Sequence, residues 1–216
     1  MIKRIVGIYY SPAGGAAKMT ERLVGEIRAG LCDGADDEVS IECFDIRDTD
    51  RLPQMDEETL AVIGMPVYLG KIHMPAIRAL NELSGNGAMA VDMVAFTGVS
   101  YGDALYELKE YSAGRGFVPV GAGAFSMNCG LRRDNKEGAF PMDTRTLCEF
   151  AKAASAKVQR LGGSDIEGLR IKPAPLEVKG KMPIHLVGKI SPKAAQAVQD
   201  VIDVLTFKRK DSEWFL

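Results

Sequence analysis

Five short apolar runs dominate the first part of the chain, and helical patterns separate most of them. The runs are residues 2–10, 38–46, 59–65, 88–96 and 117–125. Strands of this length that are apolar on both faces are typical of a parallel sheet covered by helices on two sides. The alternation of strands and helices therefore predicts the α/β class.

Four segments repeat their apolar residues every three or four positions, as one face of a helix does. They cover residues 16–31, 75–83, 104–114 and 147–161. In the doubly wound strand order 2-1-3-4-5, the loops after the first, third and fourth strands lie at one edge of the sheet. Sheets of this kind bind ligands at that edge, outside the carboxyl ends of the strands.

The loop after the first strand contains a proline and two adjacent glycines and runs directly into the first helix. This arrangement directs several backbone N–H groups and the positive end of the helix dipole to one spot, which suits a phosphate group. The loop is neither a Walker A sequence nor Gly-x-Gly-x-x-Gly, so neither a nucleoside triphosphate nor a dinucleotide is its obvious ligand. An ordinary first turn of a βαβ unit is the alternative. The candidate phosphate-binding residues are Ser11, Ala13, Gly14, Gly15, Ala16 and Ala17.

The composition excludes several classes of partner. The formal net charge is −2, so the chain has no polyanion-binding character and we expect no nucleic-acid partner. No apolar run approaches the ~20 residues that span a bilayer, and the start of the chain lacks a signal-peptide pattern. The four cysteines are scattered without a Cys-x-x-Cys pair, which predicts no metal site and fits a reduced protein. We therefore expect a cytoplasmic protein without a membrane partner.

The sequence pattern changes after residue 161. Glycines and prolines predict an extended arm, and Ser191-Pro192 would start a last helix. We therefore divide the chain into a domain of residues 1–161 and a C-terminal arm and helix of residues 162–216. The apolar face of the last helix must be buried, either on this subunit or on a second copy, and the second arrangement would be a homodimer.

Three loops resemble those of a known family. Residues 11–16, 66–70 and 96–105 occur at the spacing of flavodoxin-like FMN-binding domains, in particular those fused to a bacterial ferredoxin module. The resemblance covers residues 1–161 and implies a flavodoxin-like sheet of five parallel strands, in the order 2-1-3-4-5, with helices on both faces. The cysteine-rich iron–sulfur module of the fused proteins does not follow here. We therefore expect the electron partner to be a separate redox protein, a ferredoxin or a reductase, or a small-molecule electron acceptor.

The resemblance also implies roles for the three loops. The first would bind the phosphate of FMN, and the other two would flank its isoalloxazine ring, with Tyr68 and Tyr101 as the aromatic faces. Gly70, or the peptide before it, would turn toward the flavin N5. No side chain is expected to act as an obligatory acid or base, so FMN would supply the redox chemistry. The candidate residues around the ring are Pro66, Val67, Tyr68, Leu69, Gly70, Thr97, Gly98 and Tyr101.

Two departures from the family pattern favour an alternative. Related phosphate loops carry threonine where this chain has Ala13 and Ala16, and each missing hydroxyl removes a hydrogen bond worth about 1–3 kcal/mol. The third loop has Val99-Ser100 in place of an Asn-Arg pair. The alternative function is therefore a flavodoxin-fold domain that has lost flavin and acts as an interaction module.

A serine hydrolase is the second alternative. Residues 98–102 match Gly-x-Ser-x-Gly, the nucleophile elbow, between a predicted strand and a predicted helix. Ser100 would be the nucleophile, and Asp143 and His185 follow it in the order that α/β-hydrolases use. Against this, no His-Gly-Gly oxyanion segment precedes the serine, and His185 lies in the proline-rich arm.

Overall fold

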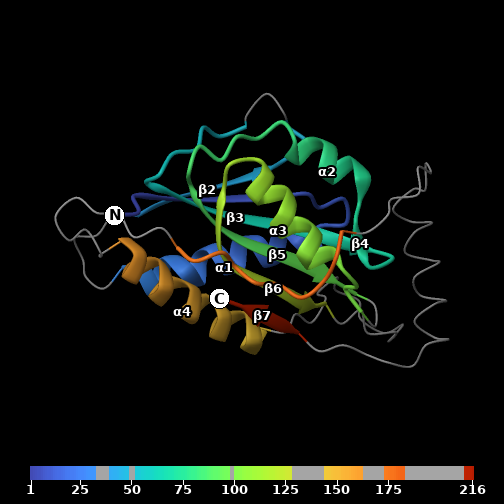
Figure 1. Cartoon of the computed structure of the whole chain (residues 1–216). Coiled ribbons are helices and arrows are strands. Elements are labelled where there is room, and N and C mark those ends of the chain that lie inside the picture. The colour runs from blue at the N-terminus through green and yellow to red at the C-terminus, as the bar shows by residue number, and fades with distance from the viewer. Residues whose placement is uncertain (33–38, 49–51, 98–99, 128–143, 163–172, 183–211) are drawn as a thin grey trace.

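The computed structural model describes residues 1–32, 39–48, 52–97, 100–127, 144–162, 173–182 and 212–216. Within them, one mixed sheet carries helices on both faces (Figure 1). No helix in this part of the chain is both long enough and apolar enough to cross a membrane.

Five parallel strands form the sheet in the order β2-β1-β3-β5-β6, which confirms the predicted order 2-1-3-4-5. Each lies within three residues of a predicted run. The strands are β1 (Arg4–Tyr9), β2 (Ser40–Asp45), β3 (Thr59–Tyr68), β5 (Met89–Phe96) and β6 (Val118–Ser126).

The prediction of only five strands, all of them parallel, was wrong in detail. β4 (Lys71–Ile72) folds back on β3 as an antiparallel hairpin, and β7 (Glu213–Phe215) pairs antiparallel with the outer edge of β6. Both strands are too short to show a periodic pattern in the sequence. The expectation that every strand is apolar on both faces also fails at β2, because this edge strand is exposed over residues 40–43.

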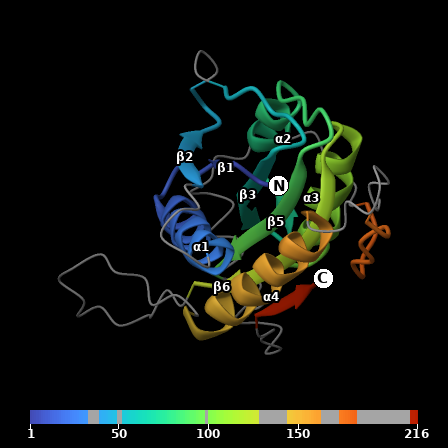
Figure 2. The same ribbon diagram turned by 90° about the vertical axis from the view of Figure 1, so that its left-hand side faces the viewer.

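The helices cover the two faces of the sheet in pairs. α1 (Gly15–Leu31) and α4 (Thr144–Gly162) pack on one face, and α2 (Met74–Leu80) and α3 (Ala104–Gly114) lie on the other (Figures 1 and 2). Successive strand residues point to opposite faces, so Ile5 belongs to the cluster under α1 and α4, whereas Val6 belongs to the cluster under α2 and α3. Burial of both clusters fixes the strand register.

Part of the predicted C-terminal arm packs on the domain. Leu176 and Val178 are buried in the α2–α3 cluster, and β7 extends the sheet. The predicted helix after Ser191, and with it the prediction of a homodimer, lies outside the described residues. The division at residue 161 stays a prediction.

Candidate functional site

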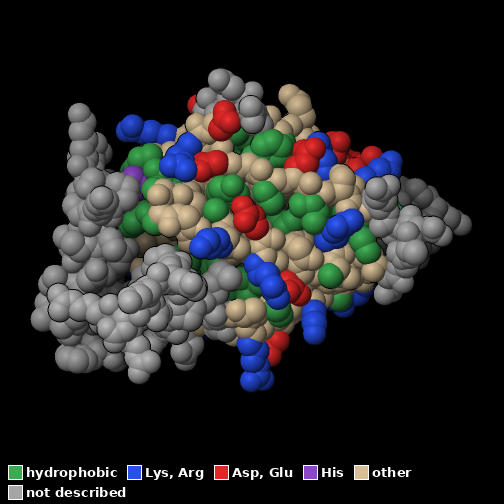
Figure 3. Space-filling view, turned by 180° about the vertical axis from the view of Figure 1, so that it is seen from behind, with side chains coloured by type: hydrophobic (Ala, Val, Ile, Leu, Met, Phe, Trp, Pro, Cys, Tyr) green, Lys and Arg blue, Asp and Glu red, His purple; other side chains and the backbone are tan. Residues whose placement is uncertain are grey.

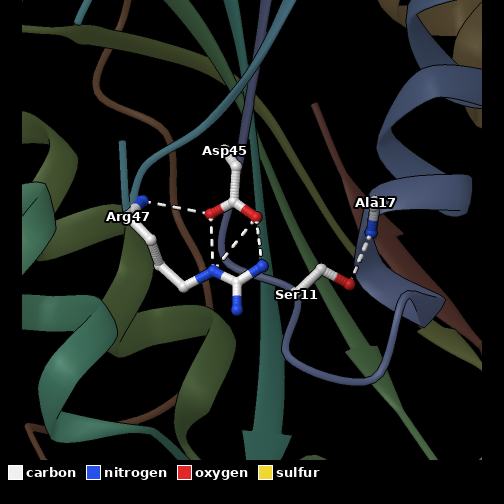
Figure 4. A network of polar contacts seen from close by, with 4 residues as sticks. All are labelled: Ser11, Ala17, Asp45 and Arg47. Atoms are coloured by element: carbon white, nitrogen blue, oxygen red, sulfur yellow. Dashed lines mark hydrogen bonds and ion pairs between the residues drawn. The ribbon is translucent and has the colours of Figure 1, made fainter. Parts of the chain in front are cut away.

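The loop between β1 and α1 has the geometry of an anion-binding turn. Gly14 is the N-cap of α1 with φ 81°, a left-handed conformation that glycine adopts without strain. Its N–H donates to the carbonyl of Ser11 at 3.2 Å. The Ser11 hydroxyl oxygen accepts the N–H of Ala17 at 3.0 Å (Figure 4). Since a hydroxyl that accepts a hydrogen bond keeps its proton, Ser11 can still donate to a ligand.

The first turn of α1 presents donors without an internal acceptor. Among the described residues, the N–H groups of Gly15 and Ala16 donate no hydrogen bond, as expected for the start of a helix. No acidic side chain occupies this turn to neutralise the positive end of the dipole. The Ala17 amide, predicted to bind phosphate, is instead satisfied by Ser11.

A hollow opens beside this turn, at the carboxyl ends of β1, β3 and β5. Its volume is about 60 Å³. Eight predicted residues line it: Ser11, Ala13, Gly15, Ala16, Pro66, Val67, Tyr68 and Thr97. Five other predicted residues do not line it, and Gly98 lies outside the described residues; the five are Gly14, Ala17, Leu69, Gly70 and Tyr101.

Three lining residues were missed by the sequence analysis: Pro12, Ala95 and Met127. Met127 follows β6 and donates its N–H to the carbonyl of Phe96 at 2.6 Å. Its side chain covers Gly15 so closely that a Cβ on that glycine would lie 2.5 Å from the methionine methyl group. Its position in the sequence could have indicated this, because Met127 directly follows β6, a parallel strand whose carboxyl end lies at the same edge of the sheet.

Tyr68 provides the aromatic wall of the hollow. It ends β3 and is half-buried, and burial raises the pKa of its hydroxyl, so the ring stays neutral. The His73 ring, just before α2, meets it edge-on with the ring centres 5.3 Å apart. The Tyr10 ring lies 5.9 Å from the same histidine. Tyr68 is therefore held by aromatic neighbours on the side of α2.

An ion pair lies at the end of β2, next to β1. The Arg47 Nε lies 2.9 and 3.0 Å from the two carboxylate oxygens of Asp45, and its Nη2 lies 2.5 Å from Oδ2 (Figure 4). This hydrogen bonding lowers the pKa of Asp45 and raises that of Arg47. The guanidinium also lies over the Tyr10 ring, 5.9 Å from its centre. Because Asp45 neutralises it, Arg47 is not a free cation for a ligand.

The β3–β4 hairpin turns at Leu69 and Gly70, which have φ values of 54° and 71°. Positive φ at both central residues is the requirement of a type I′ turn. The Gly70 carbonyl accepts the N–H of Asp103 at 3.1 Å, and a Cβ on Gly102 would lie 2.5 Å from that carbonyl oxygen. The second and third loops therefore pack backbone against backbone. The Leu69–Gly70 peptide remains the candidate for the predicted contact with N5.

Tyr101 does not lie beside Tyr68 in the hollow. Only 3% of its surface is exposed, its ring packs 5.6 Å from Phe96, and its hydroxyl donates to the carboxylate of Glu213 in β7. Burial and this carboxylate both raise the pKa of Tyr101. Its role beside a flavin ring stays a prediction, and this geometry does not support it.

The hydrolase residues are only partly described. The Ser100 hydroxyl accepts the N–H of Gly102 at 3.1 Å, which closes a local turn. Asp143 and His185 lie outside the described residues. In the described part of the chain, no group of three His, Cys, Asp or Glu side chains is arranged to hold a metal ion.

Compared by sequence, the chain matches no protein-family model and no curated protein. By structure it is similar to a flavodoxin from the domain Archaea, with 15% identity, a TM-score of 0.50, and coverage of 72% of this chain and 99% of that chain. It is also similar to an oxidoreductase from Corynebacterium diphtheriae, with 10% identity, a TM-score of 0.50, and coverage of 74% and 96%. The chain has a flavodoxin-like fold.

A third similar structure belongs to a longer chain. The rubredoxin oxygen:oxidoreductase of Desulfovibrio gigas is 14% identical with a TM-score of 0.42, and the match covers 72% of this chain and 37% of that one. At identities of this size the likeness concerns the fold, and the function has to be argued from the site.

Proposed function

We propose that this flavodoxin-like domain binds FMN non-covalently and serves in electron transfer or flavin-dependent reduction. The supporting observation is the hollow, which is lined both by the α1 turn with its unbonded amides and by Tyr68. This combination of an anion-binding turn and an aromatic ring matches a ligand that has an anionic group and an aromatic ring.

The residues around the first loop fit a phosphate. Gly15 and Ala16 offer N–H groups, Ser11 offers a hydroxyl proton, and the first turn carries no competing carboxylate. Among the described residues, none except the chain neighbours of Gly14 has an atom within 4 Å of where its Cβ would be. Ala13 and Ala16 offer no hydroxyl, so we expect weaker binding than a threonine-containing loop would give, by about 1–3 kcal/mol for each missing hydrogen bond.

The roles of the protein are to bind and orient the cofactor. Bound FMN would supply the electron transfer. Tyr68 would cover the ring on one side, and the Leu69–Gly70 turn lies directly after it in the chain. The electron partner we propose is a separate redox protein or a small-molecule acceptor. The scattered cysteines support a reducing compartment, and we propose the cytoplasm.

Ala13 offers the sharpest test because it is exposed and lines the hollow. Ala13→Thr should tighten FMN binding by roughly 5- to 150-fold, the equivalent of one recovered hydrogen bond to a charged group. Ala13→Asp should abolish FMN binding by repulsion, while its carboxylate near the start of α1 leaves the helix stable. Affinities would be measured by fluorescence titration of flavin.

Riboflavin is the matched control ligand because it has the same ring and no phosphate. Both Ala13 variants should bind riboflavin as the original chain does. An absence of flavin absorbance in the purified protein, together with no binding at excess FMN for the original chain and Ala13→Thr, would refute the proposal.

The interaction module is the second candidate, and two observations favour it. The hollow has a volume of only about 60 Å³, and Tyr101 faces the core instead of the hollow. A module of this kind would fail both titrations and keep its fold, which circular dichroism would show.

A further inference from the structure

The C-terminal extension contacts the third loop at two places. Residues 173–182 lie against α3, where the Lys181 N–H donates to the Asp103 carboxylate at 3.4 Å. β7 reaches the same loop from the sheet edge, through Glu213 and Tyr101. Both described segments of the extension, residues 173–182 and 212–216, therefore contact the segment around the start of α3.

The register of β7 places Glu213 at the functional edge of the sheet. Glu213 pairs with Ala124, near the carboxyl end of β6, and its side chain accepts the hydroxyl of Tyr101. Trp214 points to the opposite face, where its ring lies 5.9 Å from Phe150. Glu213 therefore contacts the third loop, and its neighbour Trp214 contacts α4.

The contact continues from Tyr101 to the hairpin turn that follows Tyr68. Gly102 packs on Gly70, and the Asp103 N–H donates to the Gly70 carbonyl. A continuous row of contacts therefore joins Glu213, through residues 101–103, to the Leu69–Gly70 turn. Each step is a hydrogen bond or a backbone contact, so a shift of Tyr101 would move the backbone that supports the turn.

We infer that Glu213 is a positioning residue, which fixes Tyr101 and through it holds the third loop on the Leu69–Gly70 turn. Tyr101 acts here as a structural anchor of the loop, not as a face of the ligand site. The effect on the protein without ligand is independent of the proposed function. The consequence for ligand affinity rests on the proposed binding of FMN beside Tyr68.

Hydrogen–deuterium exchange of the ligand-free full chain tests this inference. Glu213→Ala and Tyr101→Phe should each speed exchange in peptides covering residues 69–71 and 101–103 by about tenfold, the loss expected for a hydrogen bond to a charged group. Peptides of β1 and α4 should be unchanged. Glu213→Gln keeps an acceptor oxygen and should preserve most of the protection.

Two controls isolate the contact. Glu177→Ala makes the same change at an exposed position of the extension and should leave exchange in both loops unchanged. Trp214 is the only tryptophan of the chain, so an unaltered emission spectrum shows that β7 remains docked in each variant. If Glu213→Ala undocks β7, Tyr101→Phe provides the test.

The double variant decides whether Glu213 acts through Tyr101. If it does, Glu213→Ala with Tyr101→Phe exchanges no faster than either single variant. Additive effects, or unchanged exchange at residues 69–71, would overturn the inference. Weaker FMN binding by the single variants would extend it to the cofactor. Faster exchange in a chain that binds no FMN would support the positioning role and refute the proposed function.

Discussion

Asp92 makes the stability of the fold depend on pH. This aspartate lies in the middle of β5 with none of its surface exposed, on the face covered by α3. One carboxylate oxygen accepts the hydroxyl of Ser112 at 2.7 Å, and the other, also buried, has no hydrogen-bond partner within the described structure. Burial raises its pKa from 3.8 to about 7, against the opposing effects of Ser112 and Lys109.

The direction of the effect follows from proton binding. The folded state holds a proton on Asp92 up to about pH 7, whereas the unfolded chain releases it near pH 3.8. Between these values the folded state binds more protons, so the free energy of unfolding decreases as pH rises. A gap of about three pH units at about 1.4 kcal/mol each corresponds to about 4 kcal/mol lost by pH 8.

Asp92→Asn removes this titration and can keep the hydrogen bond from Ser112. Relative to the original chain, we expect the variant to gain about 3 kcal/mol of stability between about pH 5 and about pH 8, since about two of the three pH units between the unfolded and folded pKa values lie in this range. Urea unfolding at several pH values gives both free energies, and their difference isolates Asp92 from the other titrating groups. Ser112→Ala should decrease the stability of the original chain at about pH 8 by about 1–3 kcal/mol, because the buried carboxylate then loses its donor.

The matched control is Glu82→Gln, which removes a carboxylate at an exposed position. Its stability should follow that of the original chain at every pH. A constant difference between Asp92→Asn and the original chain from about pH 5 to 8 would refute the reasoning, since it would mean that the buried carboxyl does not change its protonation.

Three further substitutions test the loops, each by thermal or urea unfolding. Leu69→Asn should stabilise the protein by about 1 kcal/mol, because a positive φ costs leucine more conformational free energy than asparagine. An unchanged free energy of unfolding would argue against a type I′ turn. Gly102→Ala should destabilise the protein by about 1–3 kcal/mol, because the added Cβ would contact the β3–β4 turn and because Gly102 has a φ of 55°. Gly114→Ala is the control and should be neutral or stabilising, since no described atom lies within 4 Å of the added Cβ beyond its own chain neighbours and helix backbone. Ser11→Ala should lower stability by about 1 kcal/mol because the Ala17 amide loses its hydrogen-bond acceptor, and unchanged stability would exclude that hydrogen bond in solution.

The sheet could be predicted because its information is local and repeated. Each central strand is a mostly apolar run between polar or glycine-rich turns, interrupted in β5 by Asp92. Runs of this kind that alternate with amphipathic helices are typical of strands buried on both faces. The added strands carry no such signal. β4 has only two residues. β7 has three, and it forms by pairing with the outer edge of β6, some 90 residues earlier in the chain. The exposure of β2 likewise follows from its position at the edge of the sheet, and the residues of β2 alone do not indicate that position.

The two halves of the candidate site differ in the same way. The anion-binding half consists of backbone groups, and the glycines and the helix start in the sequence directly indicate how that backbone turns. The aromatic half consists of side chains whose direction depends on distant partners. Tyr68 ends β3 and Tyr101 lies in the loop after β5, yet only Tyr101 turns into the core, because a carboxylate 112 residues away accepts its hydroxyl. The sequence of a single segment can therefore predict a site built from backbone groups. The role of a side chain also depends on which residue, distant in the sequence, it contacts.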